Sequence, residues 1–356
     1  MKRILIWLAV VALVFVVLFT TNQKPEKPLP QAASGELSEP FGDSTLTLVF
    51  YNVENLFDIH DDPEKNDQEF LPGSKKQWTA ERYQQKLADL SRVLAETGGD
   101  ELPEIVGLCE VENRQVVEEL FSTGPLQAGG YAVVHVESRD ARGIDVSFAY
   151  RPDELKVLGN STVSVRKGNR RLTTRDILFV TGLAGNGERF HIFINHWPSR
   201  VGGESESEPD RIAAAAALRT VVDSLQQADP EAHIVIMGDM NDEPGNRSLR
   251  ETLAAGSPET NSSSGLVNLM LPAFQRGEGS YNYRGDWNML DNLVVSSSLL
   301  DEEGFRCTDR EGHIFRREWM EFRNRKGEVS PNRTYAGNKY TGGVSDHFPV
   351  YFRLVR

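Results

Sequence analysis

The sequence is short of basic residues. It has 39 lysines and arginines against 52 aspartates and glutamates, which gives a formal net charge of -13. An acidic surface repels a polyanion, and proteins that hold long duplex DNA usually do so with a basic face that releases counterions. Extended binding of nucleic acid is therefore disfavoured, although a local basic patch is compatible with a short phosphate-bearing substrate.

Cysteine is also scarce, with two residues in 356. Cys109 lies in an apolar stretch, where an unpaired cysteine behaves as a small buried hydrophobe, and Cys307 is far away in sequence. A disulfide between them is permissible in an oxidising compartment, and two cysteines do not decide the matter. No cysteine follows the N-terminal apolar run, so attachment of a lipid there is not indicated.

Internal repeats and long low-complexity breaks are absent after residue 43. Apolar residues make up 39% of the sequence and charged residues 26%, which is typical of a globular protein. We therefore expect one large domain over residues 44–356. Residues 21–43 contain four prolines and little apolar material, and are predicted to form an extended, Pro-rich tether.

The chain has one long apolar run, at its N-terminus. Two basic residues precede an uncharged stretch over residues 4–20, which at ~1.5 Å per residue nearly crosses a hydrocarbon core of ~30 Å. We predict that residues 1–20 are an uncleaved membrane anchor, with a cleaved signal peptide as the alternative because Ala-Ala-Ser at 32–34 offers a cleavage site. The basic residues favour a cytoplasmic N-terminus. The folded part is thus expected outside the cytoplasm, at the cell surface or in the periplasm, or secreted.

Short runs rich in Val, Ile, Phe and Tyr recur through the folded part, as is typical of β-strands. The predicted strands cover residues 45–51, 104–109, 131–136, 144–150, 177–181, 190–195, 233–237, 293–295 and 348–355. Helices are predicted at 79–97, 111–121, 210–227 and 246–255, and loops at 202–210 and 261–265. Because several strands follow one another directly, we expect a mixed α/β fold with antiparallel pairing rather than a regular βαβ array.

Polar side chains stand at the ends of these strands. Those that follow a strand are Asn52, Glu110, His196, Asp239 and Asn241, and those that precede one are Asp291, Asp346 and His347. In an antiparallel sheet the end of one strand lies beside the start of its neighbour, so all of these side chains are expected along one edge of the sheet system.

This group contains carboxylates, amides and imidazoles but no cysteine. Oxygen ligands with few nitrogens suit Mg²⁺, Mn²⁺ or Ca²⁺ better than Zn²⁺. Such an ion neutralises phosphate charge, amide and imidazole donors stabilise charge on oxygen, and a His-Asp pair orients a water for attack. The pattern predicts metal-assisted hydrolysis of a phosphate ester.

Five motifs follow one another along the folded part. They are Tyr-Asn-Val-Glu-Asn at 51–55, Leu-Cys-Glu-Val-Glu-Asn at 108–113, Asn-His-Trp-Pro-Ser-Arg at 195–200, Gly-Asp-Met-Asn-Asp at 238–242 and Ser-Asp-His-Phe-Pro-Val at 345–350. In this order they resemble the motifs of the endonuclease/exonuclease/phosphatase superfamily, the DNase I-like phosphoesterases that depend on Mg²⁺. The resemblance implies a four-layer α/β/β/α sandwich of two mixed, largely antiparallel sheets, with the active site at one end.

The resemblance also implies roles for the metal and for the attacking water. Glu110 would be the principal ligand of Mg²⁺, or of Mn²⁺ in its place, with Asn52 and Asp346 completing or supporting its shell. His347 would be the imidazole next to the attacking water, oriented by Asp291.

Further roles follow from the same resemblance. Asp239 would position or deprotonate the nucleophile, Asn241 would donate to the phosphate, and His196 would bind a phosphate oxygen or assist the leaving group. Arg142 and Arg175 fall where the family places groups that contact the substrate. Whether Asp239 or the imidazole beside the water takes the proton, and whether one or two metal ions act, stays open.

We therefore predict an exported, monomeric, Mg²⁺-dependent phosphodiesterase, in the first place a nuclease acting on nucleic acid. Hydrolysis of a phospholipid headgroup, as in a sphingomyelinase, or of an inositol phosphate is the alternative, favoured by the membrane segment and the acidic surface. The alternative outside enzymes is a catalytically silent surface-binding module on the same fold. It is disfavoured because no metal or proton-transfer position is degraded.

Other polar residues are interpreted more simply. The basic stretch from Arg316 to Lys326 is interpreted as a solvated, half-buried insertion, with contact to nucleic acid or a lipid headgroup as the alternative. The remaining histidines are interpreted as structural: His60, His135, His191, His233 and His313.

Overall fold

The computed structural model describes residues 45–260 and 264–356, so the predicted anchor at 1–20 and the tether at 21–43 lie outside the described residues. Contacts divide the chain into Met1–Glu39 and Pro40–Arg356, and all described residues fall in the second unit. Within the described ranges, no helix combines the length and the apolar composition needed to cross a bilayer.

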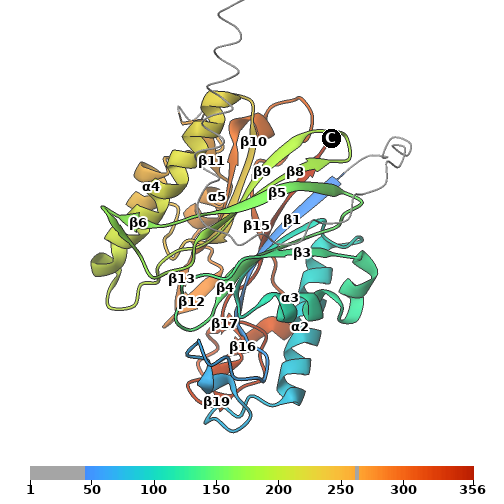
Figure 1. The fold of residues 1–356 in the computed structure, drawn as a ribbon, viewed down its shortest axis with the longest axis vertical. Coiled ribbons are helices and arrows are strands. Elements are labelled where there is room, and N and C mark those ends of the chain that lie inside the picture. Colours follow the sequence, from blue (N-terminus) through green and yellow to red (C-terminus); the bar gives the residue numbers. More distant parts are fainter. Residues whose placement is uncertain (1–44, 261–263) are drawn as a thin grey trace, which may run out of the picture. The chain divides into compact units, whose positions relative to one another are not determined.

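The first sheet has six strands, with two parallel strands at its centre. Its order is β15 (His313–Ile314), β20 (Val350–Val355), β1 (Thr45–Leu56), β2 (Ile105–Val111), β4 (Asp145–Tyr150) and β3 (Ala132–His135). Strands β1 and β2 run parallel, while β20 returns antiparallel to β1 and β4 returns antiparallel to β2. The first and last long strands of the domain are therefore neighbours (Figure 1).

The second sheet repeats this plan. Its order is β11 (Leu266–Asn268), β14 (Asp291–Ser296), β10 (His233–Asp239), β9 (Arg189–His196), β8 (Ile177–Ala184) and β5 (Leu155–Val163). Strands β9 and β10 run parallel and β14 returns antiparallel to β10. In each sheet, the ends of two parallel strands therefore lie beside the start of one antiparallel strand.

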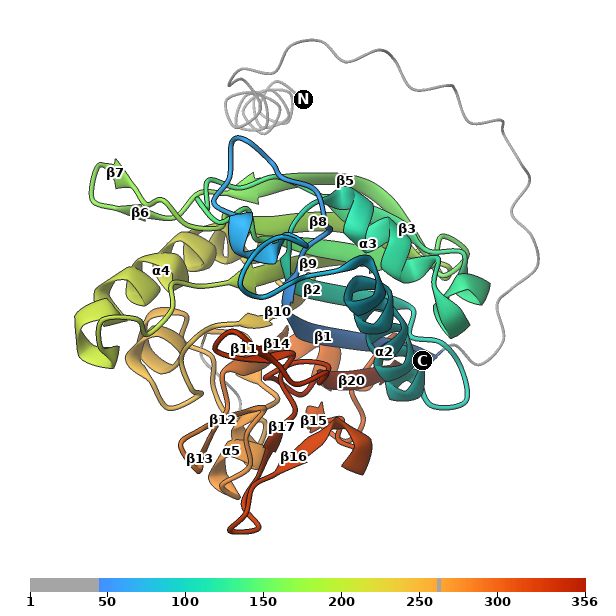
Figure 2. The ribbon, with the colours of Figure 1, turned by 90° about the horizontal axis from the view of Figure 1, so that it is seen from below.

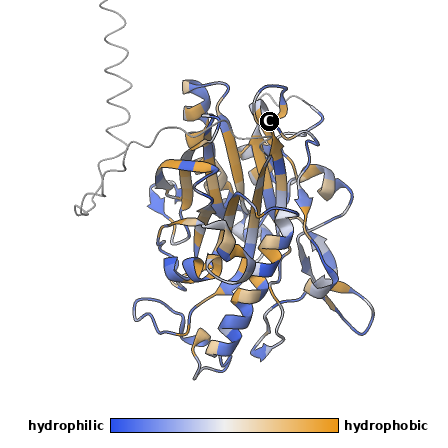
Figure 3. Ribbon diagram, turned by 90° about the vertical axis from the view of Figure 1, so that its right-hand side faces the viewer, coloured by the Kyte–Doolittle hydropathy of each residue, from blue (hydrophilic) through white to orange (hydrophobic). Residues whose placement is uncertain are grey.

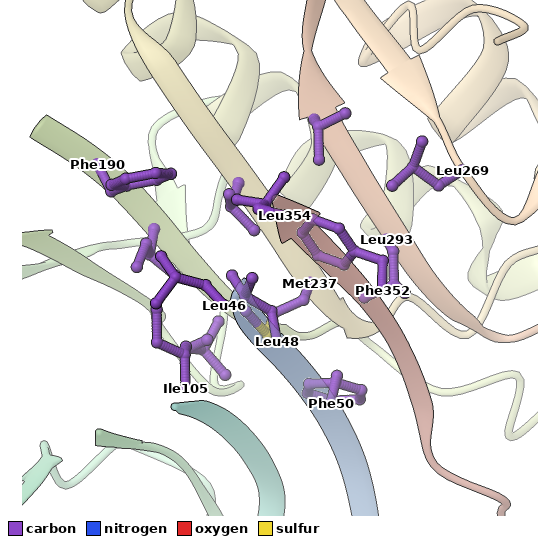
Figure 4. Packing of buried hydrophobic residues seen from close by; sticks show 14 of the residues in the cluster. Leu46, Leu48, Phe50, Ile105, Phe190, Met237, Leu269, Leu293, Phe352 and Leu354 are labelled. Carbon is purple, nitrogen blue, oxygen red and sulfur yellow. The ribbon is translucent and has the colours of Figure 1, made fainter. Parts of the chain in front are cut away.

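Strand β1 shows why the sheets stack. Successive side chains of a strand point to opposite faces. Accordingly, Leu48 and Phe50 belong to the core between the two sheets, which they share with Met237 of the second sheet (Figure 4). Val49 and Tyr51 belong instead to the core under the helices. The strand is apolar on both faces because each face is covered.

Helices cover the outer faces of both sheets. Helices α2 (Ala80–Gly98) and α3 (Arg114–Phe121) pack on the first sheet, and α4 (Glu204–Ala228) packs on the second. Viewed from below, α2 and α3 lie on one side of the strands and α4 on the other (Figure 2), and apolar colour is concentrated in the strands between them (Figure 3). The predicted four-layer α/β/β/α sandwich is confirmed.

The remaining elements are short. Four hairpins project from the sandwich: β6 (Arg166–Lys167) with β7 (Arg170–Arg171), β12 (Tyr281–Tyr283) with β13 (Asp286–Asn288), β16 (Glu321–Arg323) with β17 (Val329–Pro331), and β18 (Tyr335–Ala336) with β19 (Lys339–Tyr340). The short helical turns are η1 (Gln68–Phe70), η2 (Gly124–Gly129), η3 (Ser248–Thr252), α5 (Leu271–Gln275), η4 (Ser297–Leu300) and η5 (Glu318–Met320).

Several predicted boundaries are wrong. The expected loop at 202–210 forms the first turns of α4, because its Glu204 and Glu206 favour the positive end of a helix. The helix expected from residue 111 begins at Arg114, since the Asn113 side chain accepts a hydrogen bond from the backbone of Val116 and caps it. The helix expected at 246–255 shrinks to a five-residue π-helical turn.

The structure shows where the two cysteines and the basic stretch at 316–326 lie. Cys109 and Cys307 are both free and buried in the core between the sheets. The stretch from Arg316 to Lys326 forms η5 and the hairpin strand β16, with Met320 buried and Phe322 exposed.

A buried ion pair ties α4 to the loop after β10. The side chains of Arg211 and Asp242 are fully buried, with Nε and Oδ1 2.7 Å apart at an angle that is not that of a hydrogen bond. Asp242 Oδ2 also accepts a hydrogen bond from Ser248 Oγ at 2.6 Å. A buried carboxylate without its cation is costly, so this loop depends on the arginine.

We predict that Arg211→Ala lowers the free energy of unfolding by about 3–5 kcal/mol, because the buried Asp242 carboxylate loses its nearest cation and keeps only Arg200, whose Nη2 is 3.6 Å away. Denaturant unfolding followed by circular dichroism measures the change. The matched control is Arg247→Ala, whose partners Glu208 and Glu251 lie on the surface; its cost is expected to stay below about 1 kcal/mol. Equal costs for the two variants would contradict the prediction.

Candidate active site

Strand register brings three predicted residues together on the second sheet. Asp239 at the end of β10 pairs with His196 at the end of the parallel strand β9 and with Asp291 at the start of the antiparallel strand β14. Neighbouring strands lie about 4.8 Å apart, so these residues are adjacent by backbone geometry alone. The predicted gathering of strand ends and strand starts at one edge is observed.

Asn52 connects this row to the first sheet. Its Nδ2 donates to Asp239 Oδ2 at 3.0 Å and lies 3.4 Å from Glu110 Oε1. Its Oδ1 accepts a hydrogen bond from the backbone N–H of Glu54 at 3.0 Å, which fixes the orientation of the amide. The side chain therefore presents a donor to both carboxylates and bridges the two sheets.

Glu110 is held in a strained backbone conformation. Its φ is 63°, and the pairing of β2 with β4 shifts register between Cys109 and Val111. Its Oε2 accepts a hydrogen bond from the backbone of Asn55 at 3.0 Å, in a bulge of β1. Positive φ is uncommon outside glycine and persists where the surroundings enforce it, often at functional sites. Here the two bulges aim the carboxylate at the shared edge.

His347 and Asp291 form a buried hydrogen-bonded pair. His347 Nδ1 lies 2.6 Å from Asp291 Oδ2, and the hydroxyl of Ser280 donates to the same oxygen at 2.5 Å. The ring of Tyr281 lies against the imidazole, with centroids 4.8 Å apart. Burial lowers the pKa of His347, but the Asp291 carboxylate outweighs it, so the pKa stands well above its ordinary value. The imidazole is therefore protonated and its Nε2 carries a proton towards the site.

Asp239 lies between two imidazoles. Its Oδ2 is 3.8 Å from His196 Nε2 and 3.9 Å from His347 Nε2, and its Oδ1 accepts the backbone N–H of Asn241 at 2.9 Å. Burial raises the pKa of Asp239 to about 7, against the opposing effect of His347. A carboxylate with this pKa exchanges a proton near neutral pH, as a general base does.

His196 differs from the other imidazole in its charge. Burial, followed by the positive charges of Arg175 and Arg142, holds the pKa of His196 well below its ordinary value. Its Nδ1 is buried and makes no hydrogen bond within the protein. The side chain is therefore a neutral imidazole, 4.0 Å from Glu110 Oε1 through its Nε2.

The structure separates the two predicted arginines. Arg175 is buried, with one nitrogen 2.9 Å from Asp140 Oδ2 and another 2.9 Å from the carbonyl oxygen of Trp197. It supports the segment after His196 and faces no solvent. The Arg142 side chain is half exposed and is the one of the two that is open to a substrate.

Asn241 donates to the same backbone carbonyl group as Arg175, that of Trp197. Its φ is 49°, and its Nδ2 donates to the carbonyl oxygen of Trp197 at 3.1 Å. An amide nitrogen carries two hydrogens, so the second one is available for a substrate oxygen. This placement is compatible with the predicted contact to phosphate.

The donors that fit a hard divalent cation are the carboxylates of Glu110 and Asp346. Both act electrostatically on the buried ammonium of Lys86, and both are partly exposed, at 17% and 24% of their side chains. Asn52 turns its nitrogen, not its oxygen, towards this space. Mg²⁺ is commonly held by one or two carboxylates together with water and phosphate, which such an open pair satisfies.

Two tighter groups of potential ligands lie deeper. One contains Cys109, His196 and Asp239, and the other contains Asp239, Asp291 and His347. Burial raises the pKa of the Cys109 thiol well above its ordinary value, and a protonated thiol is a poor ligand. In the second group the imidazole is already bound to its carboxylate. We therefore interpret both groups as proton-handling sites rather than as the metal position.

Sequence reasoning missed the polar residues behind the metal position. Lys86 of α2 is buried and donates to the carbonyl oxygen of Glu54 at 2.7 Å and to Thr334 Oγ1 at 2.6 Å. Burial lowers its pKa to about 8 and raises that of Glu54 to about 7. Ser345 Oγ donates to the carbonyl oxygen of Asn52 at 2.7 Å. The available signal was a lysine within the apolar stripe of a helix that also carries Tyr83.

A separate group of potential ligands lies on β3 and β4. His135 Nε2 is 3.2 Å from Glu137 Oε1 and 3.6 Å from Asp145 Oδ2, and the ammonium of Lys65 lies 3.2 Å from Glu137. The lysine pairs with Glu137, so the group forms an ion-pair network, in keeping with the structural interpretation of this histidine.

The comparisons with known proteins concern the family and the fold. The family model described as "Endonuclease/Exonuclease/phosphatase family" matches residues 47–356. No curated protein matches the sequence.

Solved structures resemble the fold at low identity. An endonuclease/exonuclease/phosphatase family protein from Bacteroides thetaiotaomicron has a TM-score of 0.55 at 14% identity, over 88% of this chain and 98% of that one. The mannosyl-6-phosphatase Bt3783 of the same species has a TM-score of 0.54 at 15% identity, over 87% and 100%. TDP2 of D. rerio, complexed with a single-strand DNA product, has a TM-score of 0.54 at 14% identity, over 88% and 99%. At this identity the likeness shows the fold alone.

We predict that Asp291→Asn lowers the pKa of His347, because the amide removes the negative charge that contributes most to offsetting burial. Titration of the ring nitrogens by NMR, in metal-free protein with chelator, measures it. The matched control is Asp309→Asn, since Asp309 and His313 form an exposed pair with 2.7 Å between Oδ2 and Nε2. A His347 that still titrates well above its ordinary range in Asp291→Asn would refute the assignment.

Proposed function

The chain belongs to the endonuclease/exonuclease/phosphatase family, and on that premise we propose that it is a Mg²⁺-dependent phosphodiesterase acting on nucleic acid. Members of the family are metal-dependent phosphoric ester hydrolases, and so is this chain. The observation that carries the proposal is a buried carboxylate, Asp239, set between a neutral and a protonated imidazole at the edge of two sheets. Such a set can accept one proton and donate another within a single site.

In the proposed mechanism Asp239 accepts the proton of the attacking water. Its pKa of about 7 leaves much of it ionised at neutral pH, and Asn52 holds the accepting oxygen in place. His347 cannot take this proton while Asp291 keeps it protonated. The imidazolium instead donates from Nε2 to a phosphate oxygen and stabilises the charge that develops there.

Glu110 and Asp346 would hold the divalent cation, which supplies neutralisation of the charge on the phosphate when bound. The oxygen-only ligand pair favours Mg²⁺, with Mn²⁺ as a substitute. His196 and Asn241 both lie beside Asp239 and offer neutral donors to the phosphate or the leaving group.

The acidic composition of the chain disfavours one class of substrate. A net charge of -13 opposes the binding of a long duplex, whose affinity depends on basic contacts to phosphates. A short or single-stranded phosphodiester asks for fewer such contacts. A phospholipid headgroup is the second candidate, supported by the apolar segment at residues 4–20.

We also propose that the protein is exported and stays anchored through residues 1–20, with cleavage as the alternative. A fusion of residues 1–43 to a reporter enzyme that is active only outside the cytoplasm is expected to be active and to sediment with membranes. The control replaces Ala12 and Leu13 by arginine, which interrupts the apolar run in its middle. An inactive reporter with the parent segment would contradict export.

We predict that Asp239→Asn lowers kcat by about 10²- to 10⁴-fold, because a general base is lost while the size of the side chain is kept. The measurement uses the full chain with Mg²⁺ or with chelator on single-stranded DNA, RNA, sphingomyelin vesicles and an inositol phosphate. The matched control is Asp153→Asn, an exposed aspartate with a side chain 62% accessible. Unchanged turnover in Asp239→Asn would remove the assigned role, and turnover of lipid alone would replace the substrate.

A further inference from the structure

A hollow of about 410 Å³ opens beside the catalytic edge. Its walls come from the hairpins β12–β13 and β16–β17, which pack against each other, and from Arg333 and Asp346. Asp346 is one of the two carboxylates assigned to the cation, so the hollow begins where the phosphate would lie. The hairpins β12–β13 and β16–β17 lie near each other in Figures 1 and 2.

Aromatic exposure is concentrated in this hollow. Among the described residues, the exposed large hydrophobic side chains are Leu158, Val201, Tyr283 and Phe322. Tyr283 is 55% exposed and Phe322 51% exposed, and both line the hollow. Exposed aromatic rings beside a phosphate site are suited to stacking on a planar group of the substrate.

Asn282 adds a polar contact that the protein leaves unused. Its Oδ1 accepts the backbone N–H of Gly285 at 3.1 Å, which fixes the amide. Its Nδ2 is buried, lies in the wall of the hollow and has no hydrogen-bond partner within the protein. A buried donor without an acceptor is costly, so a ligand that brings an acceptor is favoured there.

Strand β12 sets the distance from the reaction to the hollow. Tyr281 bridges to His347 through the backbone and packs on its imidazole. Tyr283 lies two residues further along the same strand, on the same face and roughly 6.6 Å away along the chain. That step is on the scale of one nucleotide, so a group attached next to the reacting phosphate reaches the ring.

The hollow carries charges of both signs, from Arg284 and Arg333 and from Glu328 and Asp346. The guanidinium of Arg284 lies 5.1 Å from the centroid of Tyr283, and Arg333 Nη2 lies 3.3 Å from Asp346. Two arginines and two carboxylates line the hollow, so it offers no net negative charge to an ammonium headgroup such as choline. A neutral aromatic ring with hydrogen-bond acceptors on its edge needs no net charge and suits such a lining.

We propose that this hollow is a subsite for one unpaired nucleobase, stacked on Tyr283 and Phe322 and bound at its edge by Asn282. The proposal rests on the phosphodiesterase function proposed above and specifies its substrate as single-stranded nucleic acid. A base within a duplex is stacked on both faces and paired at its Watson–Crick edge, so it cannot enter the hollow.

The experiment compares a short single-stranded oligonucleotide with an abasic version of the same strand. For the parent protein with Mg²⁺, KM is expected to be about 10-fold lower with the base, because stacking of a base on aromatic rings contributes on this order. The double variant Tyr283→Ala/Phe322→Ala is expected to lose this difference, with KM for the abasic strand and both kcat values unchanged. Tyr283→Phe keeps the ring and is expected to behave as the parent.

The matched control is Leu158→Ala, an exposed apolar side chain on β5, away from the hollow, at 47% exposure. Equal KM values for the two strands with the parent protein would overturn the subsite and leave the phosphodiesterase function standing. Failure of the parent protein to hydrolyse either strand or any other phosphodiester would overturn the proposed function itself. Preference for sphingomyelin vesicles that is lost in Phe322→Ala would overturn the nucleobase in favour of a lipid headgroup.

Discussion

The site depends on one hydrogen-bonded bridge between the two sheets. The amide of Asn52 on β1 faces Glu110 of its own sheet and Asp239 of the other, with its oxygen fixed by the backbone of Glu54. Two buried or half-buried carboxylates would otherwise repel each other across the end of the sandwich. A donor between them, in a region of low dielectric, stabilises both and keeps the sheet edges in contact. His196 is then placed by strand register, and His347 by its hydrogen bond to Asp291.

The edge itself was predictable because it follows from periodicity. Asn52, Glu110 and Asp239 interrupt apolar strands at their ends, and antiparallel pairing accounts for Asp291 and His347 at strand starts. The four layers follow from strands that are apolar on both faces. Where strands are exposed the pattern fails: β5 was not predicted, because most of its residues face solvent and no alternation marks it.

What the sequence could not provide is the orientation of side chains. Arg175 and Arg142 look alike as residues, yet one is buried between Asp140 and a carbonyl group while the other is half exposed. In the sequence, Lys86 is one charged residue of an amphipathic helix. Its partners Thr334 and Val344 lie 248 and 258 positions later, and only the structure brings them together. The hairpins that form the hollow carry three residues per strand, too few for any periodic signal.

The pairing of β1 with β20 has a consequence for biosynthesis. The opening strand of the domain gains the second of its two neighbours only when residues 350–355 have been made, and Ser345 reaches back 293 positions to the backbone of Asn52. Contacts this distant in sequence form late and slowly. A ribosome-bound or prematurely terminated chain therefore exposes one side of β1 as an unpaired edge and lacks His347 altogether. The catalytic site is thus completed in a single late step of folding, so incomplete chains are inactive.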